Sequence, residues 1–265
     1  MIRKVVGFLF VLTACVGIAD AQILAMDDFE NNNPGTAYND GIQYGDNGGV
    51  GFGALTYLEG TGGGVFNATL SGARALGIFA SSGGQALGRT TQTPFIGGVY
   101  SLDARFNVDN GNAFSGFNIK SGLGSTFGAN ELMSFGLTPG SGNSAFLITD
   151  GTGTHTLTIP TVTEFRGVNF HFDLAFDTLT LAYTLTATDL ANSLSNSFSG
   201  TLIDTNGGST GTGAVSAIAF ANFNTGSDQN LIADNLAVVP EPSTWIAAGA
   251  AVLACIYLRR RTRRA

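Results

Sequence analysis

Apolar and polar residues alternate strictly in two adjacent stretches of the chain, residues 168–177 and 179–188. In the first stretch every second residue is large and apolar, with polar or small residues between: Val168, Phe170, Phe172, Leu174 and Phe176. Alternation of this kind places one set of side chains on a buried face and the other in water. The short Asp177-Thr178 connection predicts that the two stretches form a β-hairpin with one solvated face.

Residues 100–108 repeat this alternation, and Asn110-Gly111 after them is a hairpin-turn sequence that predicts residues 113–120 as the partner strand. Shorter candidate strands, mostly separated by glycine-rich segments, cover residues 73–80, 132–138, 145–149, 154–159, 194–203, 215–223 and 231–238. No segment of this region has helical periodicity. About a dozen short strands with one apolar face predict an all-β fold, an antiparallel β-sandwich.

Composition agrees with one β-sandwich body, residues 22–238. Glycine is abundant at 38 residues, and 20 phenylalanines supply material for a core. The two cysteines, Cys15 and Cys255, both lie outside the body. Disulfides, zinc–thiolate sites and thiol nucleophiles are therefore excluded from it.

The net charge of the body limits the classes of partner that it can bind. Of the 19 acidic residues, 17 lie between Ile23 and Val239, together with only 5 of the 12 basic residues. A net charge of about −12 repels nucleic acid and anionic membranes, so nucleic-acid binding is excluded.

The N-terminus has the features of a secretory signal peptide, residues 1–21. Arg3 and Lys4 precede an apolar run at 5–18, and the A-x-A cleavage sequence ends with Ala19 and Ala21. A second reading stays open: Leu12-Thr13-Ala14-Cys15 fits a lipobox, in which Cys15 would be lipidated.

The C-terminus, residues 239–265, combines three features in order. Pro240, Glu241, Pro242 and Ser243 form a segment that the prolines keep extended. A predicted membrane segment follows at 244–258; its apolar part, 14 residues from Trp245, would span about 21 Å as a helix, less than a bilayer core of about 30 Å. A basic end, 259–265, closes the chain with Arg259, Arg260, Arg261, Arg263 and Arg264.

This tail resembles the PEP-CTERM sorting signal of exported bacterial proteins. The resemblance implies that Pro240, Glu241 and Pro242 are read by an exosortase, a membrane-embedded cysteine protease, which processes the tail. It also implies transient membrane anchoring, then a cell-surface or extracellular location. Proteins with this tail are associated with exopolysaccharide and biofilm, so exopolysaccharide is an implied partner.

The two ends of the body, residues 26–30 and 232–238, resemble the first and last strands of concanavalin A-like and carbohydrate-binding jelly rolls. In several such modules these strands lie side by side near a structural calcium ion. Asp28, Glu30 and Asp234 would then be candidate calcium ligands, since Ca²⁺ takes six to eight oxygens. The alternative is that they are ordinary surface acids.

Enzymatic chemistry is not indicated by any motif. The four body glutamates, at 30, 59, 131 and 164, do not form the E-x-D-x-x-E grouping of jelly-roll glucanases. Residues 207–211 match G-x-S-x-G, and the α/β-hydrolase order requires a histidine later in the chain than this serine. The last histidine of the sequence is His171, so this requirement is not met. A glycoside hydrolase is thus the least favoured reading, and no catalytic residue is predicted.

Two readings of function remain. The first is a non-enzymatic structural protein of the cell surface or extracellular matrix. The second is a carbohydrate-binding module, which needs exposed aromatic rings for stacking. Tyr38, Tyr44 and Tyr57 are the candidate stacking residues, because the only tryptophan, Trp245, belongs to the tail.

Overall fold

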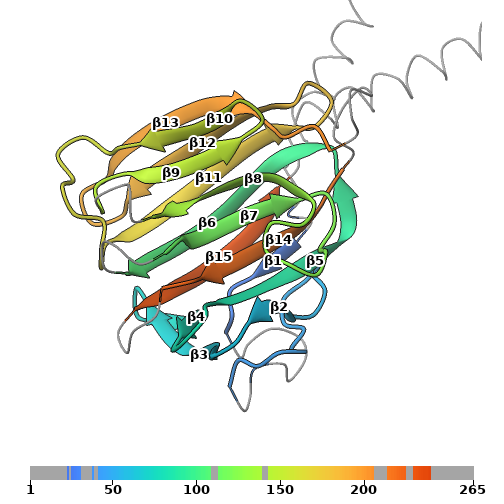
Figure 1. Cartoon of the computed structure of the whole chain (residues 1–265), viewed down its shortest axis with the longest axis vertical. Coiled ribbons are helices and arrows are strands. Elements are labelled where there is room, and N and C mark those ends of the chain that lie inside the picture. The colour runs from blue at the N-terminus through green and yellow to red at the C-terminus, as the bar shows by residue number, and fades with distance from the viewer. Residues whose placement is uncertain are drawn as a thin grey trace, which may run out of the picture.

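The computed structural model describes residues 23, 25–30, 38, 41–108, 113–138, 143–205, 214–224 and 229–239. Every regular element in these residues is a strand, and the strands form two antiparallel sheets (Figure 1). The larger sheet runs β13 (Leu194–Thr201), β12 (Ala182–Asp189), β11 (Asn169–Asp177), β6 (Gly97–Asn107), β15 (Asn230–Val239), β4 (Ala73–Ala80) and β3 (Gly63–Leu70), with β1 (Ala25–Asp27) also paired to β15. The smaller sheet runs β10 (Gly153–Leu157), β9 (Phe146–Asp150), β8 (Glu131–Leu137), β7 (Ser115–Lys120), β14 (Val215–Asn222), β5 (Gln85–Phe95) and β2 (Thr56–Gly60). The predicted all-β antiparallel sandwich is confirmed.

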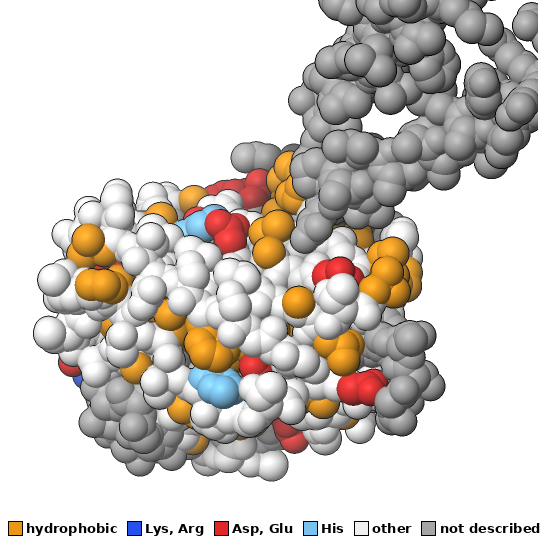
Figure 2. All heavy atoms as spheres, turned by 90° about the horizontal axis from the view of Figure 1, so that it is seen from above, with side chains coloured by type: hydrophobic (Ala, Val, Ile, Leu, Met, Phe, Trp, Pro, Cys, Tyr) orange, Lys and Arg blue, Asp and Glu red, His pale blue; other side chains and the backbone are white. Residues whose placement is uncertain are grey.

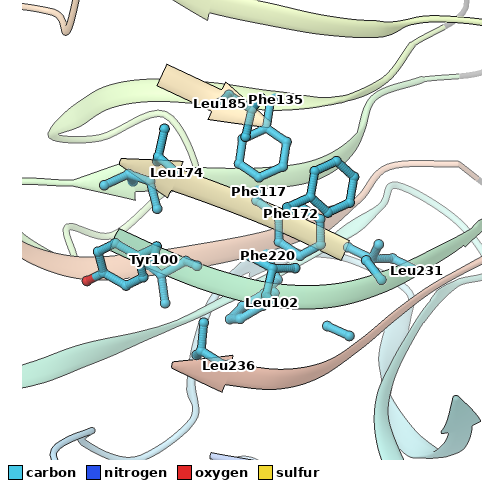
Figure 3. Packing of buried hydrophobic residues seen from close by; sticks show 14 of the residues in the cluster. Tyr100, Leu102, Phe117, Phe135, Phe172, Leu174, Leu185, Phe220, Leu231 and Leu236 are labelled. Carbon is cyan, nitrogen blue, oxygen red and sulfur yellow. The ribbon is translucent and has the colours of Figure 1, made fainter. Parts of the chain in front are cut away.

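The core between the sheets is rich in phenylalanine. Phe172 on β11 lies 5.2 Å from Phe135 on β8 and 6.2 Å from Phe117 on β7, measured between ring centroids (Figure 3). All three rings are at most 1% exposed. Each such pair adds about 0.5–1.5 kcal/mol beyond the burial of its area. The apolar alternation of the sequence therefore becomes contact between the two sheets.

The predicted hairpin at 168–188 forms, with Leu174 opposite Leu185, but its turn is longer than expected. The Asp177 carboxylate accepts hydrogen bonds from the backbone N–H groups of Leu179 and Thr180, at 2.8 and 3.4 Å. Leu179 is consequently 65% exposed, and β12 starts only at Ala182. The prediction of a two-residue connection was wrong because the hydrogen bonds to the Asp177 carboxylate stabilise a longer turn.

The second predicted hairpin is wrong. β6 pairs with β11 and β15 in the larger sheet, whereas β7 pairs with β14 and β8 in the smaller one. The apolar faces of the two strands meet across the core instead, with Phe106 5.9 Å from Phe117. The Asn110-Gly111 sequence lies outside the described residues. A turn sequence carries no information about which sheet the next strand joins, and here burial of both apolar faces decides it.

A buried ion pair ties the first strand to the sandwich. The Arg89 guanidinium on β5 donates to Asp27 Oδ2 on β1 and to the carbonyl oxygen of Gly48, and both charged side chains are fully buried. The Tyr38 hydroxyl donates to the same Asp27 oxygen at 2.5 Å. Burial, and the neighbouring Asp27 carboxylate after it, raises the pKa of Tyr38. Removing one partner would leave a desolvated charge, which is far more costly than the pair itself.

We expect Arg89→Met to lower the free energy of unfolding by about 3–5 kcal/mol, because Asp27 stays buried without its cation. The double variant Arg89→Met/Asp27→Asn should lose less than the sum of the two single variants. Urea denaturation measures both values. Additive losses would show that the two side chains act independently.

Candidate functional site

The first and last strands of the body pair in the larger sheet, as the resemblance to jelly rolls predicted. β1 runs antiparallel to β15, with Ala25 opposite Val238 and Asp27 opposite Leu236. On its other side β15 pairs with β6, up to Val239 opposite Val99. Val238 therefore lies between two strands, and Val239, the last residue before Pro240, is paired with β6.

The predicted calcium ligands lie near this pairing but bond to the protein. Asp234 is 2% exposed and accepts the N–H of Asn235 at 2.8 Å. Asp28 accepts the N–H of Glu30, and Glu30 accepts the N–H of Arg74 at 2.6 Å. No three His, Cys, Asp or Glu side chains among the described residues converge as a metal site. Asp28, Glu30 and Asp234 are thus not grouped as a metal site among the described residues, and calcium binding by them stays a prediction.

Burial is the main reason that the pKa of Asp234 is raised to about 7. Repulsion from nearby carboxylates, Asp103 first and then Asp28 and Glu30, raises the pKa further. Near neutral pH this buried group therefore binds a proton readily, which removes a negative charge from a crowded acidic region.

A polar cluster on the solvent face of β6 and β11 was not predicted from the sequence. His171 Nδ1 lies 2.6 Å from Asp103 Oδ1, and His171 Nε2 lies 3.2 Å from Ser101 Oγ and 3.3 Å from Asp173 Oδ1. The register explains the cluster, since His171 is opposite Asp103 and Asp173 is opposite Ser101. Alternation placed these residues on one face, but only the strand pairing shows that they meet.

Within the cluster, the histidine and the carboxylates stabilise each other's charged forms. The hydrogen bond to Asp103 is the largest cause of a raised His171 pKa, and Asp173 raises it further. The pKa of Asp103 is raised by burial, but hydrogen bonds from His171 and Asn235 outweigh this and lower it overall. The Asn235 side-chain amide donates to Asp103 Oδ2 at 2.8 Å. Asn235 lies where the register of β15 with β6 shifts, between Asp234 and Ala237. A protonated imidazole between two carboxylates is the arrangement that these shifts favour.

Hydroxyl groups continue this polar face toward the sheet edge. Thr184 bonds Ser199 at 2.9 Å and Thr186 bonds Ser197 at 2.8 Å, across β12 and β13. The outer face of these two strands therefore presents paired hydroxyls, whereas that of β6 and β11 presents carboxylates.

Two of the three candidate stacking tyrosines come together. Tyr44 and Tyr57 are 39% and 47% exposed, with ring centroids 5.7 Å apart at 84°. Gln85 donates its amide N–H to the Tyr44 hydroxyl. Burial of the Tyr44 hydroxyl, with the nearby Tyr57, raises its pKa to about 12. Tyr38 is 1% exposed, so its selection as a stacking residue was wrong; its hydroxyl is instead a partner of Asp27.

A buried lysine fastens a loop over the outer face of the smaller sheet. Lys120 Nζ donates to the carbonyl oxygens of Thr126 and Phe127, at 2.9 and 2.7 Å. Desolvation lowers the Lys120 pKa to about 8, although Glu131 and Glu59 oppose this shift. The Phe127 ring packs over the small residues Ala219 and Ala221 in a satellite apolar cluster. This part of the outer face is therefore covered by the chain itself.

The predicted processing residues lie outside the described residues: Ala19, Ala21, Pro240, Glu241, Pro242, Ser243 and the five terminal arginines. Within the part of the chain that the structure describes, no helix is long and apolar enough to cross a membrane. The predicted segment 244–258 is not part of that region. Strand β15 runs directly up to the predicted tail.

Comparisons with known proteins bear on the tail and the fold. Residues 238–261 match the PEP-CTERM protein-sorting motif. A comparison with curated proteins finds no match.

Solved structures of similar shape include the globular domain of Trypanosoma cruzi calreticulin, with a TM-score of 0.49 and 9% identity over 73% of this chain and 86% of that one. Lectin II from Ulex europaeus has a TM-score of 0.46 and 9% identity, covering 70% and 91%. The botulinum neurotoxin serotype D binding domain has a TM-score of 0.48 and 12% identity, covering 84% of this chain and 49% of that domain. The sandwich assignment itself depends on the strand pairing. The chain carries a PEP-CTERM sorting motif at residues 238–261, which indicates an exported, membrane-anchored protein.

Proposed function

We propose that the chain is a non-enzymatic protein of the cell surface or extracellular matrix, a β-sandwich delivered by a tail that an exosortase removes. The observation that carries the proposal is the PEP-CTERM motif at residues 238–261, which begins in the last two residues of β15: the strand ends at Val239, and the Pro-Glu-Pro sequence begins at residue 240. A folded body followed at once by a sorting signal is the organisation of a cargo protein.

The His171 cluster supports the non-enzymatic part of this proposal. Ser101, His171 and Asp103 are connected like the nucleophile, base and acid of a serine hydrolase. A general base must have a free lone pair on Nε2. Asp173, 3.3 Å from that nitrogen, favours a proton there, and an imidazolium cannot take the Ser101 proton. The cluster therefore favours a structural role for His171.

Tail processing tests the proposed route. In bacteria that carry an exosortase, Glu241→Ala should block cleavage, so that the full-length precursor accumulates in the membrane fraction. The matched control is Glu164→Ala, a body glutamate outside the motif, which should be processed normally. Immunoblots of fractionated cells measure both. Normal processing of Glu241→Ala would contradict the assigned role of the motif.

The protonation of His171 is a second test. Its raised pKa means that the bond to Asp103 stabilises the fold fully below the unfolded-state pKa of about 6.5 and that this contribution is lost as pH rises through the folded-state pKa. An NMR titration of the two histidines should show a His171 pKa that falls in Asp103→Asn. Asp177→Asn, at the far end of β11, should leave it unchanged. A His171 pKa below 6.5 in the unaltered chain would reopen its role as a base.

Carbohydrate binding is the second candidate function, and the exposed Tyr44–Tyr57 pair favours it. Aromatic faces stack on sugar rings, and the buried Gln85 amide fixes the position of the Tyr44 ring by donating to its hydroxyl. Neutral or cationic polysaccharides suit an acidic body better than anionic ones.

Affinity electrophoresis against neutral exopolysaccharides measures this binding. Tyr44→Ala/Tyr57→Ala should weaken it about tenfold, since each aromatic contact contributes roughly 0.5–1.5 kcal/mol. Phe79→Ala, which removes a 38% exposed ring elsewhere, is the control. Saturable binding that survives the double variant would place the glycan at another surface, and no saturable binding would leave the structural role alone.

A further inference from the structure

Both ends of the body leave the sandwich at the same place. β1 and β15 are antiparallel, so the start of β1 and the end of β15 lie side by side, with Ala25 opposite Val238. The signal peptide precedes β1, and the sorting tail follows β15. Both predicted membrane segments therefore connect to one end of the molecule, at the upper right of Figure 1, where β15 ends.

The tail allows little separation between this end and the bilayer. Five residues, 240–244, lie between Val239 and Trp245. At about 3.5 Å per extended residue they reach at most about 20 Å. While the tail is intact, this end of the sandwich must stay close to the membrane surface.

Exposed apolar side chains surround this exit. Ile23, two residues before β1, is 50% exposed; Ile96, directly before β6, is 49% exposed; and Leu179 is 65% exposed. Ile23 and Ile96 flank the end of β15, because β1 and β6 are its two neighbours there. Leu179 joins Ile96, since the backbone N–H of Thr178 donates to the Ile96 carbonyl oxygen at 2.8 Å. We call these three residues the exit rim.

The electrostatics of the exit rim are compatible with lipid contact. The Asp177 carboxylate is turned into its own loop by the bonds to Leu179 and Thr180. The basic residues of the body lie elsewhere: Lys120 and Arg89 are buried, Arg74 donates to the carbonyl oxygen of Tyr38, and Arg105 and Arg166 lie toward the other end of β6. Among the described residues, the exit rim thus has no basic side chain to attract anionic headgroups, so the contact of these residues with a bilayer would be apolar.

We propose that the exit rim, Ile23, Ile96 and Leu179, rests in the interface of the lipid bilayer while the sorting tail holds the protein there. The proposal depends on the proposed sorting function, because the tail supplies the anchor. The contact orients the body with its β5–β6 and β11–β12 turns toward the membrane, and it keeps the Pro-Glu-Pro sequence at the depth of a membrane-embedded protease. Lipid contact also covers apolar side chains that would otherwise face water.

The test uses the full-length chain with Cys15→Ser and Cys255→Ser, reconstituted into phosphatidylcholine vesicles. An environment-sensitive fluorophore is attached in turn to Ile96→Cys, Leu179→Cys and Leu190→Cys. Leu190 is the matched control: it is 41% exposed, and its N–H bonds the carbonyl oxygen of Asn169, at the opposite end of β11. All three positions are exposed, so the label should not disturb folding, which circular dichroism checks.

We expect the labels at 96 and 179 to shift their emission to shorter wavelength and to be quenched by lipid-borne quenchers, while the label at 190 behaves as in water. The contact should persist in high salt, because it is apolar. If the chain floats with the vesicles but all three labels report water, the exit rim proposal is overturned, while the proposed sorting function is not. If the chain does not float with vesicles at all, the tail is not an anchor and both proposals fail.

Discussion

The pairing of β15, the last strand, with strands from the first half of the chain is the constraint on which the rest of the structure depends. β15 bonds to β6 along most of its length, to β4 at its start and to β1 at its end. A strand held on both sides cannot leave without breaking backbone ladders in a buried sheet. β15 is therefore fixed in the sheet up to Val239, directly before the Pro-Glu-Pro sequence. The buried Asp27–Arg89 pair reinforces this arrangement, because Asp27 belongs to β1 and Arg89 to the opposite sheet.

The body is acidic, and its few basic side chains form contacts within the protein. Without cysteines, the described body depends on phenylalanine packing and strand pairing, and its few cations are used internally. Arg89 neutralises Asp27, Lys120 binds loop carbonyls, and His171 neutralises carboxylates on an open sheet face. An acidic surface keeps such a protein apart from anionic partners. In the proposed route, membrane association depends on the tail and on the apolar exit rim rather than on surface charge.

The sequence predicted features that depend on local pattern and missed those that depend on register. Alternation identified the β11–β12 pair, because period two directly encodes a buried face, whereas β4 was predicted at its observed bounds as a short strand between glycine-rich segments. It could not assign β6 and β7 to different sheets, since the Asn-Gly turn signal concerns four residues and not the global topology. The burial of Tyr38 was missed because it depends on a tertiary contact. The Tyr38 hydroxyl donates to Asp27, and Asp27 is buried by its pairing with Arg89, which is distant in the sequence. The Ser101–Asp103–His171 cluster escaped notice for the same reason, as it joins positions 70 residues apart. The sequence offers one sign of these buried cations: Arg89 and Lys120 each lie within a strand beside large apolar residues, Leu87 and Ile119.

The central claim is that a strand-built body is exported and separated from both of its terminal membrane segments. Intact-mass measurement of the protein recovered from outside exosortase-containing cells tests it most directly. The account predicts a polypeptide that begins at Gln22 and lacks the apolar segment and the terminal arginines, so its mass falls well below that of the full chain. Recovery of an uncut 265-residue polypeptide, confined to the cytosol, would contradict it.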